Sequence, residues 1–535
     1  MRAYSLAVTL LTTLLAPAQQ GYLPLSRVVD APVTARLQRH AKDLTQHSAI
    51  RPYLREDAAR LNDADSLWCA SWRPWMDSLA DPRHRVYGAP LAELLAGGSF
   101  SEENMFKHRA GLGGWVEYAP GPRWTLHLSA MGWNEALPDY LDSLRKAIHV
   151  TPGEGYAQGT DAVTHHDWNA WADYKAGRHF HFTLGRGRNS FGEGLRSLFL
   201  SDNAYSYPYL RITTTAWRFR YVNLFAAMSD IRGAGGRWND FALKFTSMHY
   251  LSWNALPRLN IGVFEAIVWQ DNDPSYRRGF DLNYLNPVLF YRPAEYSVGS
   301  PDNALLGFAV NVRVGRRTLL YSQLMFDEFL LSNVRAGEGW YANKQGLQLG
   351  VVGHDAFRVK GLTLRTEFNY VRPFMYAHSD TRQSYTHYNQ PLAHPYGSNF
   401  WEVLAQGELR RGHWLYSGVL SYAVLGQDSS TAANNSWGNN PFLPELQRPL
   451  RDGVRPESYG FYLAEPVQVA LFHAELRAGR LLDARSGLML QAAWSVRIRQ
   501  PEVGEGLTTS FLRIGLSANL FERHPLQDAR YALPE

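Results

Sequence analysis

Charged side chains of both signs are concentrated in one short part of the chain. They are Arg186, Arg188, Glu193, Arg196 and Asp202. A guanidinium group binds carboxylate, phosphate or sulfate through two parallel hydrogen bonds. These arginines could line the path of an anionic polysaccharide, or they could pair with the acids and fix a plug inside a pore. We favour the second interpretation and keep the five residues as candidate binding residues.

A second segment with such side chains runs from Asn286-Pro287 to Asp302-Asn303. Its prolines argue against a central strand, because proline cannot donate to a strand ladder. We expect the segment to fold over another part of the molecule. Its candidate binding residues are Arg292, Glu295 and Asp302, with Tyr291 and Tyr296 beside them. They could meet the first segment inside a pore, which spacing alone leaves open.

Trp437 is a further candidate, and it lies in a stretch rich in serine and asparagine between Ser429 and Asn440. This composition indicates a mobile external loop. Sugar rings stack on aromatic faces, so an aromatic ring among amides is typical of sugar binding. The alternative, which we favour, is a tryptophan that packs within its loop.

Two familiar ligand-binding patterns are incomplete in this sequence. The pair Gly185 and Gly187 begins a dinucleotide fingerprint, but Ser190 stands where the third glycine belongs. We expect these glycines instead to let the chain bend into or over a lumen. Asp271 and Asp273 lack the later Gly and Glu of a calcium loop. We therefore expect no cofactor and no bound metal.

Histidine and serine side chains also give no convincing catalytic pattern. His165 and His166 are neighbours on an alternating strand, so they point to opposite faces and cannot chelate one metal together. His127 and Ser129 share a face, but it is the polar one, whereas an outer-membrane lipase needs its serine at the lipid interface. We therefore expect no enzymatic activity.

The elements that carry these residues are mostly strands. From about residue 104 onward, apolar and polar residues alternate with a period of two, in segments bounded by turn-forming residues. Counted as hairpin arms, these segments make about 16 to 18 strands. After the first hairpin, the alternating segments are 164–187, 207–229, 238–270, 304–331, 344–374, 398–425, 467–499 and 508–521.

The last predicted strand shows what the two faces of this sheet meet. Its apolar face consists of Leu512, Ile514, Leu516, Ala518 and Leu520, and its polar face of Arg513, Gly515, Ser517 and Asn519. Such a strand suits a wall with lipid outside and water inside. The predicted fold class is therefore all-β: a transmembrane antiparallel β-barrel with a small N-terminal helical region. A half-buried strand of a soluble sheet is the alternative.

Three segments are too long for tight turns, namely 188–206, 271–303 and 426–466. Outer-membrane barrels place their long loops on the external side. We therefore expect these three segments at the external mouth, except where glycines turn the first of them into the lumen.

The N-terminal part of the chain is different. Val33 and Leu37 recur at helical spacing, and Pro32 indicates a break between short helices. Arg2, an apolar run and Ala16-Pro17-Ala18 fit a cleaved secretory signal. We divide the chain into a signal peptide (1–18), an N-terminal helical periplasmic segment (19–103), an outer-membrane β-barrel (104–521) and a C-terminal tail (522–535).

Composition agrees with an exported barrel. The chain has 535 residues, with Trp 17, Tyr 29 and Phe 25 but only 19% charged residues, which argues against disorder. Cys69 is its one cysteine, so no intramolecular disulfide forms. A formal charge of +5 over this length is too weak to indicate nucleic-acid binding.

Several motifs together resemble the capsule-assembly Wzi family, and within it the branch that includes the gliding-motility protein RemB. They are Tyr22-Leu-Pro-Leu25, His47-Ser48 with Arg51-Pro52-Tyr53, Leu184 to Asp202, and Asn286-Pro287 to Asp302-Asn303. The resemblance implies a single outer-membrane barrel of about eighteen strands, with a helical bundle near the periplasmic mouth and segments that obstruct the pore.

The resemblance also implies a function. It implies a non-enzymatic barrel that binds or organises capsular polysaccharide or exopolysaccharide at the cell surface, in contact with outer-membrane lipid. The alternative is a scaffold barrel of a gliding-motility or secretion-associated complex, which would bind other outer-membrane or periplasmic proteins.

Overall fold

The computed structural model describes residues 21–39, 44–59, 84–102, 105–273, 276–288, 302–328, 330–430, 432–484 and 486–521. The predicted signal peptide, Cys69 and the predicted C-terminal tail lie outside these residues. Everything said below of the structure concerns the described residues.

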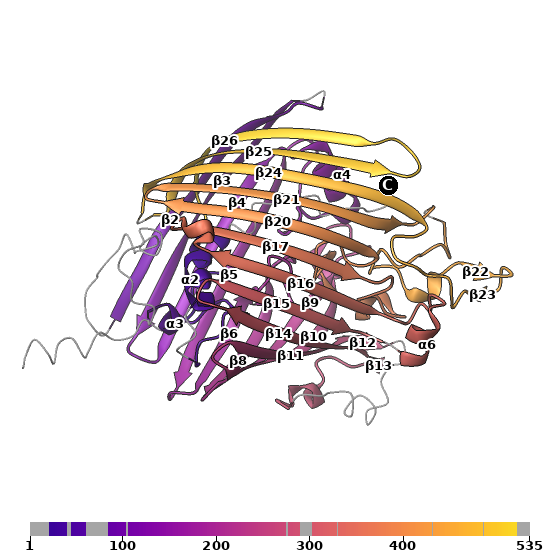
Figure 1. Cartoon of the computed structure of the whole chain (residues 1–535), viewed down its shortest axis with the longest axis horizontal. Coiled ribbons are helices and arrows are strands. Elements are labelled where there is room, and N and C mark those ends of the chain that lie inside the picture. The colour runs from indigo at the N-terminus through magenta and orange to yellow at the C-terminus, as the bar shows by residue number, and fades with distance from the viewer. Residues whose placement is uncertain are drawn as a thin grey trace, which may run out of the picture.

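Eighteen strands in this part of the chain close into one antiparallel barrel (Figure 1). Barrel strands that follow one another along the chain are paired, and β26 pairs with β2 to close the ring. The predicted fold class is therefore confirmed. The barrel strands are β2 (His84–Ser99), β3 (Phe106–Pro120), β4 (Trp124–Glu135), β5 (Val163–Ala176), β6 (Phe180–Gly187), β8 (Tyr207–Ala216), β9 (Phe219–Asp230), β10 (Ala242–Leu256), β11 (Leu259–Gln270), β14 (Asn303–Val314), β15 (Thr318–Phe326), β16 (Gln345–His354), β17 (Leu362–Val371), β20 (Phe400–Arg411), β21 (Trp414–Gln427), β24 (Val467–Asp483), β25 (Leu488–Pro501) and β26 (Leu507–Ala518).

The remaining elements lie between these strands or before them. The helices are α2 (Arg27–Arg39), α3 (Arg55–Ala59), α4 (Asp139–Ile148) and α6 (Leu331–Ala336), and the 3-10 turns are η1 (Trp238–Asp240), η2 (Leu282–Leu285), η3 (Ala356–Arg358), η4 (Thr381–Gln383) and η5 (Glu445–Gln447). The short strands pair as β1 (Ile50–Arg51) with β7 (Ser190–Phe191), β12 (Asn272–Asp273) with β13 (Tyr276–Arg277), β18 (Thr386–His387) with β19 (Gln390–Pro391), and β22 (Leu450–Arg451) with β23 (Arg455–Pro456). None of the described helices combines the length and the apolar character that crossing a membrane requires.

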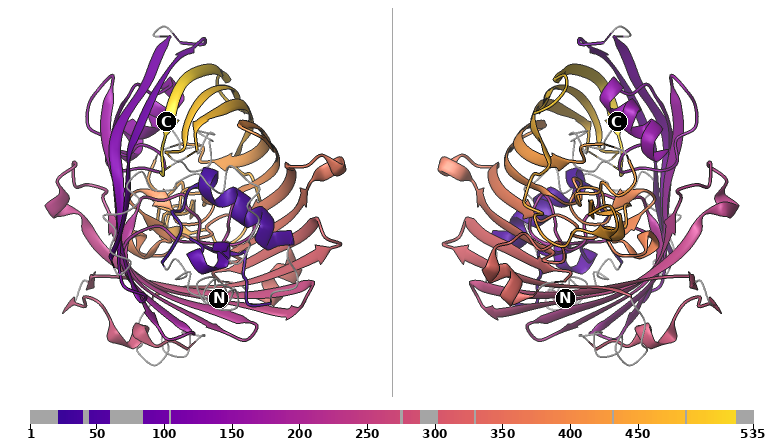
Figure 2. Two further views of the ribbon diagram at one scale, coloured as in Figure 1. Left: turned by 90° about the vertical axis from the view of Figure 1, so that its left-hand side faces the viewer. Right: turned by 90° about the vertical axis from the view of Figure 1, so that its right-hand side faces the viewer.

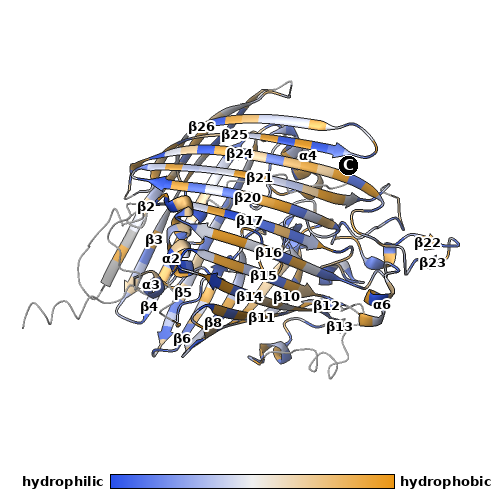
Figure 3. Ribbon diagram, in the orientation of Figure 1, coloured by the Kyte–Doolittle hydropathy of each residue, from blue (hydrophilic) through white to orange (hydrophobic). Residues whose placement is uncertain are grey.

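The alternation in sequence becomes an inside and an outside of the barrel wall. Along β4, exposed and buried residues alternate without a break. Trp124, Leu126 and Leu128 are exposed on the outer wall, whereas His127 and Ser129 are buried in the lumen. Figure 3 shows the same alternation of apolar and polar residues along neighbouring strands. An apolar outer wall of this kind suits contact with hydrocarbon.

The barrel begins earlier than the sequence predicted. Strand β2 starts at His84, whereas we placed the boundary between helices and barrel at residue 104. The period of two is hidden in β2 because apolar residues lie on both of its faces, with Glu93 among those that face the lumen. Leu91 and Leu95 are buried in the lumen, while Leu94 is exposed on the outer wall.

The two ends of the barrel differ in the length of their connections. At one end the strands are joined by short turns, such as residues 121–123 and 412–413. At the other end the connections are long, including 188–206, 372–399 and 428–466. Outer-membrane barrels have short periplasmic turns and longer external loops, so we assign the short-turn end to the periplasm.

The N-terminal helices lie inside the ring of strands. In Figure 2, α2 and α3 are the indigo helices within the barrel. Arg39 of α2 pairs with Asp355, and Arg220 near the start of β9 pairs with Asp57 of α3. These contacts place the helices at the short-turn end. Helix α2 runs through Pro32, so the break that we predicted there is absent.

Two connections fold into the lumen as a plug, which we define as residues 188–206 and 372–399. The largest cluster of buried apolar side chains includes Phe191, Phe199, Tyr376 and Tyr385 from these segments. Gly192 is essential to the first segment, since its φ of +131° is disfavoured by other residues and an added Cβ would lie 2.2 Å from an amide nitrogen of Gln323. The lumen is therefore filled mainly by the protein itself.

Residues 276–288 lie against the outer wall instead, and we call them the outer strap. Tyr284 packs on outward-facing Phe245 and Trp269. The Ser247 hydroxyl donates to the Tyr284 carbonyl at 2.7 Å, and the Tyr221 hydroxyl donates to the Pro287 carbonyl at 2.7 Å. Residues 286–288 of the second predicted segment therefore lie outside the wall, whereas its end contacts the plug, since Asp302 accepts from the Gln383 amide at 3.3 Å and Asn303 donates to the Gln383 carbonyl at 3.0 Å.

Candidate functional site

Glu402 on β20 joins both plug segments to the barrel wall. Arg196 donates to the Glu402 carboxylate at 3.1 Å, and His394 Nε2 lies 2.9 Å from it. Asn369 on β17 donates to the same carboxylate at 3.0 Å. Glu402 and His394 are both fully buried. Arg196, a predicted binding residue, therefore fixes the plug.

Glu193 and Asp202 connect the plug to the N-terminal segment. The guanidinium of Arg27 donates to both carboxylate oxygens of Asp202, at 3.1 and 3.2 Å. Glu193 accepts from Gln38 at 2.8 Å and from the Ser48 hydroxyl. The Arg27–Asp202 contact is a salt bridge of the kind that the sequence favoured, whereas Glu193 accepts from two neutral groups.

Arg188 and Arg186 both pair with the buried carboxylate of Asp167. Arg188 is buried in the lumen, where it binds Asp167 and donates to the carbonyl of Ala204 at 2.7 Å. Arg186, at the external end of β6, lies 3.7 Å from the same Asp167, and its guanidinium lies 4.3 Å from the ring centre of Trp168 and 4.6 Å from that of Tyr205.

Asp302 is buried just before β14, where it holds the outer strap. Its carboxylate accepts from Arg278 and from the Tyr284 hydroxyl, each at 2.7 Å. The other two candidates of this region, Arg292 and Glu295, lie outside the described residues.

A dense ionic cluster of the lumen was not predicted from the sequence. Arg109 pairs with Glu93 at 2.9 Å and with Glu135 and Glu154 at 2.7 Å each. His165 lies 2.7 Å from Glu135 and 2.9 Å from Glu154. The ligand atoms of Glu135, Glu154 and His165 lie within 4.8 Å of one another, which is a metal-like spacing. Because the Arg109 guanidinium contacts both of these carboxylates, we interpret the group as an ion-pair network.

His127 and Ser129 approach a catalytic geometry without access for a substrate. His127 Nε2 lies 3.1 Å from the Ser129 hydroxyl, and its Nδ1 lies 3.5 Å from Glu117. All three side chains are buried, and Glu117 also binds Arg55 of α3 at 2.7 Å. The group therefore joins the N-terminal segment to the wall.

Aromatic residues of the external loops gather around Phe374, at the start of the second plug segment. Their ring centres form a chain with spacings of 5.1 to 6.1 Å. We define the external aromatic cluster as Trp340, Tyr341, Phe374, Trp437 and Phe461.

The cluster combines a rigid base with accessible rings. Within the cluster, the side chains of Phe374 and Phe461 are fully buried, whereas that of Trp437 is half-buried. The guanidinium of Arg448 lies 3.3 Å from the ring centre of Tyr341. Arg448 is itself buried and donates to the carbonyls of Glu457 and Glu445, so it holds the loop in place. Sequence reasoning identified Trp437 but not its partners, because they come from three separate loops.

Asp428 holds the loop that carries Trp437. Its carboxylate accepts from the Trp437 amide at 2.8 Å. Burial raises the pKa of Asp428 to about 6, although the hydrogen bond from the Trp437 amide opposes this shift. The loop therefore contains a carboxyl group that ionises near neutral pH.

We predict that the loop 428–440 becomes less stable as pH rises from about 4 to above 6. Because the folded loop favours the protonated form of Asp428, this carboxyl group stabilises the loop fully below its unfolded pKa. The stabilisation is lost as pH rises through about 6, where the folded loop must bury the ionised carboxylate. Proteolysis of the loop should be faster at pH 7.5 than at pH 5, and Asp428→Asn should remove most of this difference. An unchanged pH dependence in Asp428→Asn would contradict the assignment.

The second plug segment was also missed by the sequence analysis. Residues 372–399 were divided between two predicted strand regions and an unassigned stretch. Phe374, Met375 and Tyr376 are buried in it, yet the sequence around them has no strand or helix periodicity. Turn-rich sequence with aromatic residues is compatible with both an external loop and a plug.

The fold and these contacts define a class: an outer-membrane-type β-barrel whose lumen is occupied by its own N-terminal segment and by two inward-folded connections. No family model and no curated protein matches the chain. Among solved structures, the chain is similar to Wzi of Escherichia coli, described as a carbohydrate-binding β-barrel involved in group 1 capsule assembly, with a TM-score of 0.55 and 12% identity over 92% of this chain and 98% of that chain. OccD3 (OpdP) of Pseudomonas aeruginosa matches with a TM-score of 0.40 and 10% identity over 80% of this chain and 90% of that chain.

Proposed function

We propose that this protein is a non-enzymatic outer-membrane barrel that binds or organises surface polysaccharide. The external aromatic cluster carries the proposal, because it presents the partly exposed ring of Trp437 among the long loops, while the buried Arg448 guanidinium stacks on Tyr341 and supports the cluster. The plug supports a surface role over a transport role, since the lumen is filled by buried side chains. The carbohydrate binding described for the structurally similar Wzi agrees with this proposal.

The proposed binding depends on Trp437. Its ring is partly exposed, and the exposed Tyr459 and Tyr462 lie in the same connection between β21 and β24. A sugar ring stacked on Trp437 would be beside a loop rich in amides and hydroxyls, which pair with sugar hydroxyls.

We predict that Trp437→Ala weakens binding of the host's own exopolysaccharide about tenfold or more, which corresponds to about 1.4 kcal/mol. Binding can be measured with the purified full chain on immobilised polysaccharide. Trp217→Ala is the matched control, since Trp217 is an exposed tryptophan in a turn at the opposite end of the barrel. Equal binding by the wild type and Trp437→Ala would refute the proposed site.

A scaffold barrel is the second candidate, and the outer strap favours it. Irregular backbone is not stable in contact with hydrocarbon, because its polar groups need partners. The strap places such backbone on the outer wall, with exposed Leu282 and Val288 facing away from the barrel. A partner protein in the membrane would cover this sector, as in a gliding-motility or secretion-associated complex of the RemB-like type. Absence of polysaccharide binding together with recovery of a stoichiometric protein partner would favour this candidate.

A further inference from the structure

The short turns at the periplasmic end of the barrel are rich in basic side chains. Four turns that are neighbours along the rim, between β10 and β21, contain or directly follow six such residues. The only carboxylate in these four turns is that of Asp355. We define the basic rim as Arg258, Arg316, Arg317, Arg358, Lys360 and Arg411.

The six side chains of the basic rim are exposed and unpaired. Each of them is exposed to solvent. Among the described residues none of them has a carboxylate partner, and Asp355 pairs instead with Arg39 of α2 at 3.1 Å. Like charges on neighbouring turns repel one another, which disfavours the compact state unless counter-charges lie nearby. The described part of the chain offers no free counter-charge to these six side chains.

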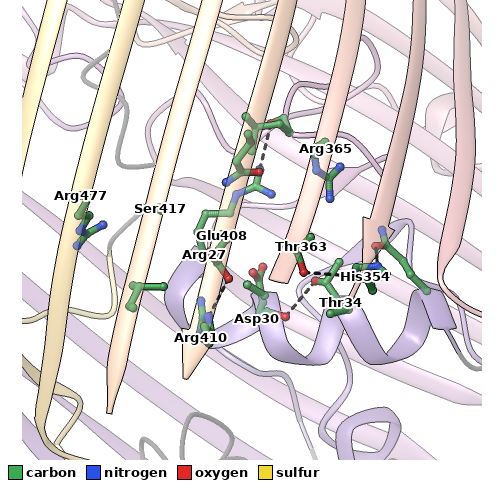
Figure 4. Close-up of a pocket in the computed structure, with 16 residues that line it drawn as sticks. Arg27, Asp30, Thr34, His354, Thr363, Arg365, Glu408, Arg410, Ser417 and Arg477 are labelled. Carbon is green, nitrogen blue, oxygen red and sulfur yellow. Dashed lines mark hydrogen bonds and ion pairs between the residues drawn. The ribbon is translucent and has the colours of Figure 1, made fainter. Parts of the chain in front are cut away.

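Basic side chains close to the rim, and others at the opposite end, do have carboxylate partners. Inside the mouth, Arg410 lies beside α2 and donates to Glu408 at 2.8 Å (Figure 4). Arg411 is the next residue, yet it is exposed and has no such partner among the described residues. In a long external connection, Arg232 pairs with Asp230. The lack of partners is therefore a property of the basic rim and not of charged surface residues in general.

Exposed aromatic side chains show the level at which the short turns meet the membrane. Trp217 lies beside Arg218 in the turn between β8 and β9, and the Arg218 guanidinium lies 5.0 Å from the ring centre of Trp217. Trp414 begins β21, three residues after Arg411. Both tryptophans are exposed. Aromatic girdles of outer-membrane barrels lie at the boundary between hydrocarbon and headgroups. The basic rim therefore lies at the level of the lipid headgroups.

We propose that the basic rim binds the phosphate groups of anionic phospholipids in the periplasmic leaflet of the outer membrane. A guanidinium group donates two parallel hydrogen bonds to a phosphate, and basic side chains are attracted to an anionic lipid surface. These contacts hold this end of the barrel at the headgroup layer. The role goes beyond polysaccharide binding by the external loops and does not depend on it.

A lipid leaflet fits the basic rim better than an acidic protein or a cell-wall polymer does. The six side chains extend over four neighbouring turns and lie close to exposed tryptophans of the outer wall, as contact with surrounding lipids requires. A partner that binds from below would meet the mouth of the barrel. There, Arg39 and Arg410 already have carboxylate partners.

The proposal is tested with the full-length protein in phosphatidylcholine vesicles. One sample contains brominated phosphatidylglycerol, and a parallel sample contains the same fraction of brominated phosphatidylcholine. Bromine quenches tryptophan fluorescence only at short range, so quenching reports which lipids lie next to the wall. We expect the relative association constant of phosphatidylglycerol to exceed that of phosphatidylcholine about threefold or more, and high salt to reduce this preference.

Variants of two neighbouring turns test whether the basic rim causes the preference. Arg316→Gln with Arg317→Gln should about halve the preference, and the further changes Arg358→Gln and Lys360→Gln should abolish it. The matched control is Arg335→Gln with Arg455→Gln, which removes two exposed arginines at the external end and should leave the preference unchanged. All variants are first checked for the compact electrophoretic mobility of a folded barrel.

Four results would overturn the proposal. The first two are equal quenching by the two brominated lipids in the wild type, and an unchanged preference in the folded fourfold variant. The third is loss of the preference in millimolar glycerol phosphate, which would indicate a site for free phosphate. The fourth is a fourfold variant that no longer sediments with purified cell-wall sacculi but keeps its lipid preference, which would indicate a cell-wall polymer.

Discussion

Replacing Arg109 by leucine should destabilise the barrel by about 3–5 kcal/mol, because it removes the cation shared by three carboxylates. Glu93 and Glu135 are buried, and Glu154 is largely shielded from solvent. Burial alone would raise the pKa of Glu154, but Arg109 and His165 outweigh burial and lower it. Loss of Arg109 would therefore leave excess negative charge where water cannot screen it.

The measurement is the denaturant midpoint of the protein in detergent micelles, with the folded fraction read from electrophoretic mobility without heating. A second substitution, Arg109→Leu with Glu154→Leu, should recover part of the loss, since it removes one uncompensated carboxylate. Arg232→Leu is a control that should change stability by at most about 1 kcal/mol, because its partner Asp230 lies at the loop end of β9 and Arg232 is partly exposed. A loss under 1 kcal/mol in Arg109→Leu would contradict the shared-cation interpretation.

The wall of the barrel could be predicted because its rule is local. The residues of β4 and β26 alternate between lipid and lumen, so the period of two is visible without knowledge of neighbouring strands. The rule is harder to see where apolar residues lie on both faces. In β2, Leu91 packs in the lumen with Trp115 and Met131, and the first barrel strand was therefore assigned to the helical segment.

The interior could be predicted only in part, because its contacts join residues far apart in sequence. Charge in the Arg186 to Asp202 segment indicated salt bridges, but the partners Arg27 and Glu402 are more than 150 residues away from Asp202 and Arg196. No spacing rule connects such pairs. The external aromatic cluster has the same property, since its rings come from separate loops.

The sector of the wall under the outer strap lacks the apolar outer face found elsewhere, and the contacts of the strap explain why. Asn223, Ser247 and His249 face outward on β9 and β10, where lipid-facing positions elsewhere are apolar. The strap accepts a hydrogen bond from Ser247 at the Tyr284 carbonyl and another from Tyr221, whose hydroxyl also contacts His249, at the Pro287 carbonyl. The sequence of this sector is therefore polar because the chain itself, and not hydrocarbon, lies against it.

Replacing Glu402 by leucine should release both plug segments and leave the barrel wall closed. The variant removes the acceptor of Arg196 and His394, and it leaves a buried guanidinium without its carboxylate, at a cost of about 3–5 kcal/mol. The wall hydrogen bonds of β20 are backbone bonds and do not use this side chain. We therefore expect a folded barrel with increased single-channel conductance in planar bilayers and faster proteolysis near Arg196.

Glu475→Leu is the matched control, because Glu475 pairs with Arg513 of the wall and should destabilise the barrel without raising its conductance. Equal conductance of the wild type and Glu402→Leu, in protein shown to be folded, would mean that packing of Phe191, Phe199 and their neighbours holds the plug without this carboxylate.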